Sequence, residues 1–167
     1  MICQMFHHAI TGSWTDEYKI VLLYTFLLNM MKKYEQLDIS GDVGLRVWGQ
    51  TLEELFAHAA EGMGELVTDT TNVEQTEKKE ISLVSENIES MFIQWLNELI
   101  FLFDAHGFLG KSFDVHIADL ALHAQISGGI YNPEQNESRL LIKAATYHQV
   151  SIQKVNSMWE AAVIFDI

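Results

Sequence analysis

The chain has 167 residues, of which 49% are hydrophobic and 11% aromatic, so it can form one domain with a buried core and is not a disordered chain. Its 23 acidic residues against 10 basic ones give a formal net charge of −13, which excludes a surface that binds nucleic acid mainly through phosphate contacts. The acidic excess favours a basic partner protein, a cation or plain solubility.

The beginning of the chain differs in composition from the rest. Its apolar run, residues 20–31, is shorter than the roughly 20 residues that a membrane-spanning helix needs, and no small-residue cleavage site follows it. We therefore predict no membrane association. Two interpretations stay open: translation starts at Met30 or Met31, or residues 1–30 form an amphipathic appendage on a domain of residues 31–167. The single cysteine excludes an intrachain disulfide and a cysteine-based zinc cluster, and is compatible with the cytoplasmic location that we expect.

Two strands and a helix are predicted at the start of this domain. Residues 33–37 and 43–48 have strand-like patterns, and the turn between them contains Gly41. Thr51 followed three residues later by Glu54 is a capping box, which begins a helix. Apolar side chains at helical spacing continue this helix: Leu52, Leu55, Phe56, Ala59, Met63 and Leu66.

A strand, a second helix and a long β-like region follow. Residues 73–84 alternate loosely and predict a strand, and Ser85 is the expected N-cap of the next helix. That helix is apolar almost all round over residues 96–103, so we expect it to be the central buried helix. Beyond Gly107 we predict strands at residues 113–122, 139–147, 148–155 and 158–166, with the last hairpin turn at Asn156-Ser157.

This order of elements predicts the fold class. Two strands, a helix, a strand and a helix (ββαβα) are followed by about four strands, with no internal repeat. Such a mixture indicates an α+β domain in which two helices pack on a largely antiparallel sheet.

Two acidic points far apart in the sequence are the best candidates for a site. Asp38 and Asp42 bracket the early turn, where Gly41 lets the backbone come close to a ligand. Asp166 follows four apolar residues, and an aspartate drawn into a core must be hydrated, paired or bound to a cation. If the fold brings Asp166 beside Asp42, these carboxylates and the terminal carboxyl group of Ile167 form an oxygen-only site for calcium, magnesium or manganese. The alternative is that the aspartates of the turn only favour the turn.

Lys143 is the other candidate, because it lies in the otherwise apolar segment 140–147. Strand alternation would place it on one face with Leu141 and Ala145, so it either offsets nearby acids or reaches solvent at a sheet edge. The sequence has no HExxH motif, no G-x-S-x-G motif and no glycine-rich phosphate loop before a helix. We therefore expect no enzymatic nucleophile and predict that the protein is not an enzyme.

Several short motifs occur in a specific order. They are an aspartate-rich turn within residues 34–49, then T-L-E-E-L-F at 51–56, W-L-N-E-L at 95–99, I-K-A-A-T-Y-H at 142–148 and I-F-D-I at 164–167. In this order they resemble the archease family, small activators of the 3′-phosphate RNA ligase of tRNA splicing. The resemblance implies a protein that helps the ligase through guanylylation with GTP and metal, so that the ligase turns over repeatedly, while the archease itself is not the catalyst.

The resemblance also implies roles for individual residues. A divalent cation, calcium before magnesium or manganese, would be bound by Asp42, Asp166 and Ile167. Lys143 would contact the ligase or its nucleotide. Asp38 would not bind the ion itself but would hold the ligating residues in position.

One departure from the family pattern concerns the early turn. Where the family motif D-H-T-A-D has His-Thr-Ala, this chain has Ile39-Ser40-Gly41, so any role of that histidine is lost or moved. The resemblance thus implies that this protein is a metal-binding activator of an RNA ligase. We expect the activator itself to make no direct contact with nucleic acid. The alternatives are a chaperone-like scaffold for RNA-modifying enzymes without a metal site, and a small hydrolase with a carboxylate-bound metal.

Overall fold

The computed structural model describes residues 32–39 and 41–167. The chain divides into two units, Met1–Lys32 and Lys33–Ile167. The two interpretations of residues 1–30 fall on residues outside the described ones, and both stay predictions.

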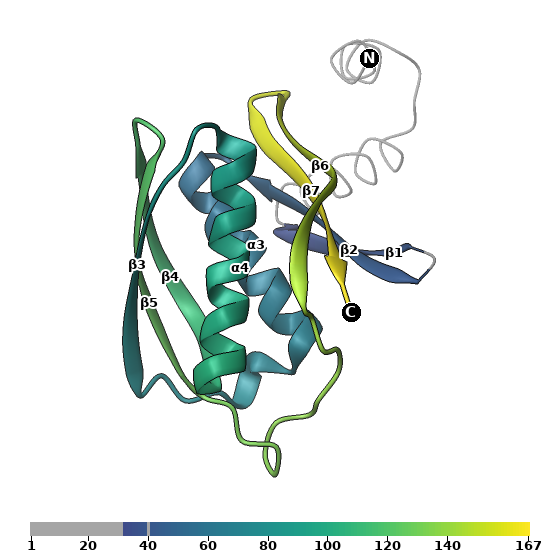
Figure 1. Cartoon of the computed structure of the whole chain (residues 1–167), viewed down its shortest axis with the longest axis vertical. Coiled ribbons are helices and arrows are strands. Elements are labelled where there is room, and N and C mark those ends of the chain that lie inside the picture. The colour runs from purple at the N-terminus through teal and green to yellow at the C-terminus, as the bar shows by residue number, and fades with distance from the viewer. Residues whose placement is uncertain (1–31, 40) are drawn as a thin grey trace, which may run out of the picture. The chain divides into compact units, whose positions relative to one another are not determined.

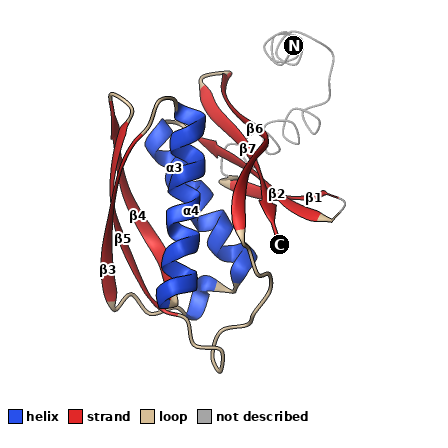
Figure 2. Ribbon diagram, viewed as in Figure 1, coloured by secondary structure: helices blue, strands red, loops and turns tan. Residues whose placement is uncertain are grey.

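Within residues 32–39 and 41–167, two helices lie between two antiparallel sheets (Figures 1 and 2). The helices are α3 (Leu52–Val67) and α4 (Ile88–His106). The four-stranded sheet has the order β1 (Tyr34–Ile39), β2 (Asp42–Gly49), β7 (Met158–Asp166) and β6 (Ala144–Val155). The three-stranded sheet has the order β3 (Glu77–Val84), β5 (Ala121–Ile130) and β4 (Phe108–Ala118). The predicted α+β class and the ββαβα order followed by four strands are confirmed, and the strands divide between two sheets.

The helix starts follow from local hydrogen bonding. At the start of α3, Thr51 Oγ1 accepts a hydrogen bond from Glu54 N (3.2 Å), which is one half of the predicted capping box. The Glu54 carboxylate accepts from Gln50 N (2.8 Å) rather than from the main-chain nitrogen of Thr51. The N-cap of α4 is Asn87, whose side chain accepts from Ser90 N (2.8 Å). Ser85 was therefore the wrong N-cap, by two residues, because asparagine caps helices as well as serine does.

Two hairpin turns have positive φ at both central residues although neither contains glycine. The predicted turn at Asn156 (φ 50°) and Ser157 (φ 70°) joins β6 to β7. The turn at Asp119 (φ 48°) and Leu120 (φ 61°) joins β4 to β5. This second turn divides the strand predicted at residues 113–122, and it was missed because leucine is not a usual turn residue.

The approach to β6 also differs from the prediction. Residues 139–143 lie outside the strand, because the main-chain nitrogens of Arg139 and Leu140 donate to Val67 O (2.9 Å) and Leu66 O (3.2 Å) at the end of α3. The two strands predicted from residue 139 to residue 155 are one strand, β6, whose register with β7 shifts between Thr146 and Ser151.

The core includes both helices, and the most deeply buried side chains of α4 lie in its first half. Phe92 and Trp95 are fully buried, Phe92 makes an edge-to-face contact with Phe56 (5.0 Å between ring centroids), and Trp95 Nε1 donates to Phe56 O (3.0 Å). The expected all-round burial of residues 96–103 is wrong at Phe101, which is 57% exposed. The helix is central, as predicted, but its second half keeps one side in solvent.

Candidate functional site

The pairing of β2 with β7 brings the two acidic points together. Val43 lies opposite Phe165 in this antiparallel pair, and extending the register by one residue places Asp42 level with Asp166. Val43 and Phe165 are buried, whereas both aspartates are exposed, so alternation along the strands projects the carboxylates from the sheet face that points away from the helices. Directly opposed residues on neighbouring strands have Cβ atoms about 4.5–5.5 Å apart.

Lys143 joins this end of the sheet through two hydrogen bonds. Its main-chain nitrogen donates to Asp166 O (2.8 Å), and its ammonium Nζ donates to Ile167 O (2.8 Å). Lys143 is exposed whereas Ala145 is buried, so the expectation that the two share one face is wrong. The reason is that Lys143 precedes β6 and does not take part in its alternation.

Asn97, on α4, fixes the backbone beside Lys143. Its Oδ1 accepts from Ala145 N (2.9 Å) and its Nδ2 donates to Ala145 O (3.1 Å). Because β6 is an edge strand, these are backbone groups that no neighbouring strand pairs. The sequence analysis missed this role, although an amide between Leu96 and Leu99 in an apolar helix was a usable signal.

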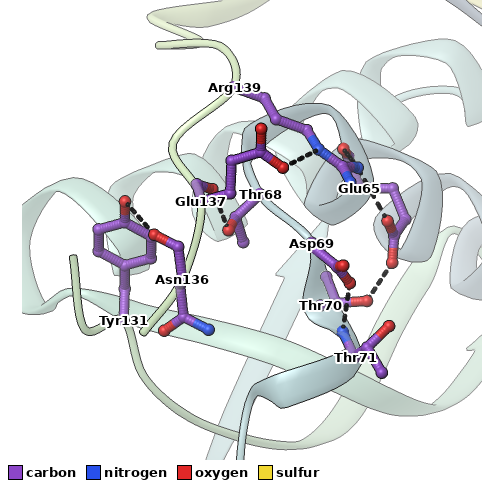
Figure 3. A network of polar contacts seen from close by, with 9 residues as sticks. All are labelled: Glu65, Thr68, Asp69, Thr70, Thr71, Tyr131, Asn136, Glu137 and Arg139. Carbon is purple, nitrogen blue, oxygen red and sulfur yellow. Dashed lines mark hydrogen bonds and ion pairs between the residues drawn. The ribbon is translucent and has the colours of Figure 1, made fainter. Parts of the chain in front are cut away.

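A polar cluster anchors the loop that leads to Lys143 (Figure 3). Arg139 donates to Glu65 O (2.9 Å) and to the Glu65 carboxylate (3.2 Å), and its Nε lies 3.7 Å from Glu137. The buried Thr68 hydroxyl donates to the main-chain oxygen of Glu137. The loop is thereby tied to the C-terminal end of α3, which sets where residues 140–143 enter the site.

The same cluster contains a carboxylate with a shifted pKa. Hydrogen bonds from the Thr71 side chain and main-chain nitrogen (2.9 Å to Asp69 Oδ1) lower the pKa of Asp69 below its usual 3.8. Asp69 also caps the short 3-10 turn Thr70–Asn72. Its charge therefore supports the turn that follows α3.

Asp38 is not brought onto the carboxylate face. It lies opposite Val43, so alternation directs it to the other face of the sheet from Asp42, and its Oδ1 accepts from Gln36 Nε2 (3.1 Å). The residue opposite Asp42 is Ile39. An apolar side chain thus occupies the position nearest Asp42 on β1, and the supporting role of Asp38 stays a prediction.

The chemistry of Asp42, Asp166 and Ile167 fits a hard cation. Among residues 32–39 and 41–167, neither carboxylate has a hydrogen-bond or ion-pair partner, and no group of three or more His, Cys, Asp or Glu side chains could hold a metal ion. Two carboxylates supply up to four oxygens, and the main chain of Ile167 adds another. Calcium takes about 6–8 oxygen ligands, so water or a partner would complete its shell. A soft metal that prefers sulphur or imidazole does not fit this set.

Comparison with known proteins decides the family. The family model described as the archease protein family matches residues 34–167. The chain belongs to the archease family. An archease from Methanosarcina mazei is 34% identical over 141 residues, which cover 81% of this chain and 97% of the relative. An archease from Sulfurisphaera tokodaii is 30% identical over 139 residues, which cover 82% of this chain and all of the relative.

Solved structures agree with this assignment of the archease fold. The solution structure of a Methanobacterium thermoautotrophicum protein is 35% identical, with a TM-score of 0.70, over 80% of this chain and 98% of that chain. A crystal structure from Thermotoga maritima, described as an archease and possible chaperone, is 22% identical with a TM-score of 0.57, over 80% of this chain and 96% of that chain, and shows the fold alone. The resemblance drawn from the ordered motifs is thus confirmed. In the described part of this archease, no helix is both long and apolar enough to cross a membrane.

Proposed function

We propose that this archease is a cation-dependent accessory protein that assists a 3′-phosphate RNA ligase in tRNA splicing and is not itself the catalyst. The observation that carries the proposal is the register that places Asp42 level with Asp166. Like charges directly opposed on neighbouring strands destabilise a sheet. Neither carboxylate has a cationic partner among the described residues, and a bound divalent cation would remove the repulsion between them.

The position of Lys143 supports the same proposal. Its ammonium lies at the end of the sheet that carries the carboxylates, so a positively charged side chain and the proposed cation site share one exposed end of the sheet. When bound, the cation would supply positive charge to phosphate oxygens at the guanylylation step of the ligase. Lys143 would orient the ligase or its nucleotide, and the main chain of Ile167 would hold the ion against the sheet.

The net charge of the protein indicates that its partner has a basic surface. A protein with a net charge of −13 is attracted to basic surfaces and does not compete for RNA phosphates. A metal-dependent RNA ligase needs basic residues around its substrate path. The archease would therefore approach that enzyme without displacing the RNA, and we expect no direct contact with nucleic acid.

A ligation assay tests this function. Substoichiometric ligase is supplied with GTP, a divalent cation and RNA ends, with or without the archease, and products per ligase molecule are counted. We expect multiple turnover with wild type and loss of stimulation with Asp166→Asn. Asp114→Asn is the matched control, because Asp114 is an exposed strand aspartate on the three-stranded sheet. No stimulation by wild type, or full stimulation by Asp166→Asn, contradicts the proposal.

A chaperone-like scaffold for RNA-modifying enzymes is the second candidate. It is favoured by exposed apolar side chains, among them Leu141 (65%) and Tyr147 (59%), and by the description of the Thermotoga maritima protein as a possible chaperone. A scaffold needs no ion, so calorimetric titration with calcium separates the two candidates. Heat of binding that disappears in Asp42→Asn supports the cation-dependent activator, whereas no heat together with ligase stimulation supports the scaffold.

A further inference from the structure

We propose that Lys143 holds the main-chain oxygen of Ile167 in the cation-free protein and gives it up when the cation site is loaded. The inference rests on the cation site proposed above. Its starting point is the 2.8 Å hydrogen bond from Lys143 Nζ to Ile167 O. The same Ile167 oxygen belongs to the proposed ligand set, so the ammonium and a divalent cation would compete for it.

The surrounding contacts allow the Lys143 side chain to move while its backbone stays in place. The main-chain nitrogen of Lys143 is bound to Asp166 O (2.8 Å), and Ala145 is held by both polar atoms of Asn97. The loop before Lys143 is anchored through Arg139 and Glu65. The ammonium itself is exposed, on a flexible four-carbon stem, and makes a single surface hydrogen bond of small net value.

Electrostatics oppose simultaneous occupation of the Ile167 oxygen. An ammonium about 3 Å from that oxygen and an ion about 2.4 Å from it would lie roughly 5 Å apart. In water, the repulsion between a single and a double charge at about 5 Å changes an equilibrium constant by roughly tenfold, and salt reduces this. Lys143 therefore lowers the affinity of the site for a divalent cation by about three- to tenfold.

The competition couples the two positive groups of the site. Without the cation, the Lys143 ammonium is tethered to the chain end. With the cation, the ammonium is free to reach a phosphate-bearing partner beside the ion. A contact through Lys143 is thus strengthened when the site is loaded, which makes Lys143 a positioning residue that responds to the cation.

Calorimetric titration of the full chain with calcium chloride tests the competition. We expect Lys143→Met to bind calcium about three- to tenfold more tightly than wild type. Lys154→Met is the matched control, because Lys154 lies near the far end of β6, with Nζ 5.6 Å from the Trp159 ring centroid, and loses the same charge. Its affinity should stay within about twofold of wild type. Equal affinity in the two lysine variants, or weaker binding by Lys143→Met, overturns the inference.

The outcomes also separate this inference from the proposed function. If wild type binds no calcium, the cation site itself fails. If wild type binds, Asp42→Asn does not, and Lys143→Met equals Lys154→Met, the site stands and only the competition fails.

A second measurement follows the ammonium directly. Acylation of lysines, quantified by mass spectrometry, should rise at least twofold at Lys143 when calcium chloride is added and remain constant at Lys154. The rise should be absent in Asp42→Asn. An unchanged rate at Lys143 in wild type that binds calcium contradicts the release of the ammonium.

Discussion

The opposed carboxylates predict that one substitution has opposite effects on stability with and without cation. Asp166→Asn removes one of two charges that the register places on facing positions of β2 and β7. Two unit charges about 5 Å apart in water repel by about 0.8 kcal/mol. Cross-strand pairs contribute about 0.2–1 kcal/mol, which is the same range. In the presence of a chelator, the variant should therefore be about 0.5–1 kcal/mol more stable than wild type.

Calcium should reverse that order. At a concentration of 100 times the dissociation constant, a ligand that binds only the folded state adds about 2.7 kcal/mol to the free energy of unfolding. Wild type should gain this amount, and Asp166→Asn, with one carboxylate missing, should gain little. The hydrogen bonds of Lys143 at the chain end go to main-chain oxygens of residues 166 and 167, so the substitution leaves both acceptors in place.

Urea denaturation followed by circular dichroism, with and without calcium, measures both effects. Asp114→Asn serves as control, because the 3.5 Å contact of Asp114 with His116 is exposed and worth little. The control should change by less than about 0.5 kcal/mol and show the calcium response of wild type. The reasoning is refuted if Asp166→Asn is less stable than wild type in chelator, or if calcium stabilises both proteins equally.

Three further predictions concern the elements around the site. Asn97→Ala leaves two backbone groups of edge strand β6 without their partner, so it should lower the free energy of unfolding by about 1–3 kcal/mol in urea denaturation. Gln94→Ala is the control, because Gln94 is exposed on the same helix and its substitution should cost less. Gly44→Ala would place a Cβ 2.9 Å from Ile39 Cδ1, the flexible end of that side chain, and 3.1 Å from Leu37 Cβ. We expect a loss of about 1 kcal/mol that Ile39→Ala partly restores, and a loss unaffected by the second substitution would exclude the Ile39 contact as its cause. Because Thr71 lowers the pKa of Asp69 below 3.8, ionised Asp69 stabilises the folded state above that pH and loses this contribution as the pH falls through the folded-state pKa. Asp69→Asn should therefore reduce the acid-induced loss of stability below about pH 4, measured by urea midpoints from pH 6 to 2; an unchanged acid limb would contradict it.

Local signals predicted the parts of the fold that local chemistry determines. The capping box of Thr51 and Glu54 predicted the start of α3, and the Asn156-Ser157 turn predicted the last hairpin, because in each case neighbouring residues supply the hydrogen bonds or backbone freedom. The order of elements followed from the periodicity of apolar residues, because that periodicity is set within each helix or strand. The Asp119-Leu120 turn escaped detection because its backbone conformation depends on the two strands that it joins rather than on leucine.

Long-range pairing was beyond the reach of sequence patterns. Nothing in the periodicity of β3, β4 and β5 indicates that they form a sheet of their own on the far side of the helices. The predicted meeting of Asp42 and Asp166 was conditional on an unknown register, and the β2–β7 pairing supplies that register. Asn97 was overlooked because its partner is backbone on a strand distant in sequence. Cation binding, the ligase and the role of Lys143 stay proposals that the experiments above decide.

The order β1-β2-β7-β6 determines when, during synthesis, Asp42 and Asp166 can come together. The two central strands come from opposite ends of the second unit, so joining them closes a very long loop whose entropy opposes early formation. A growing polypeptide on the ribosome has no such pair until β7 has emerged. Pairing of Asp42 with Asp166 is therefore coupled to completion of the tertiary structure, and incomplete or misfolded copies lack the pair.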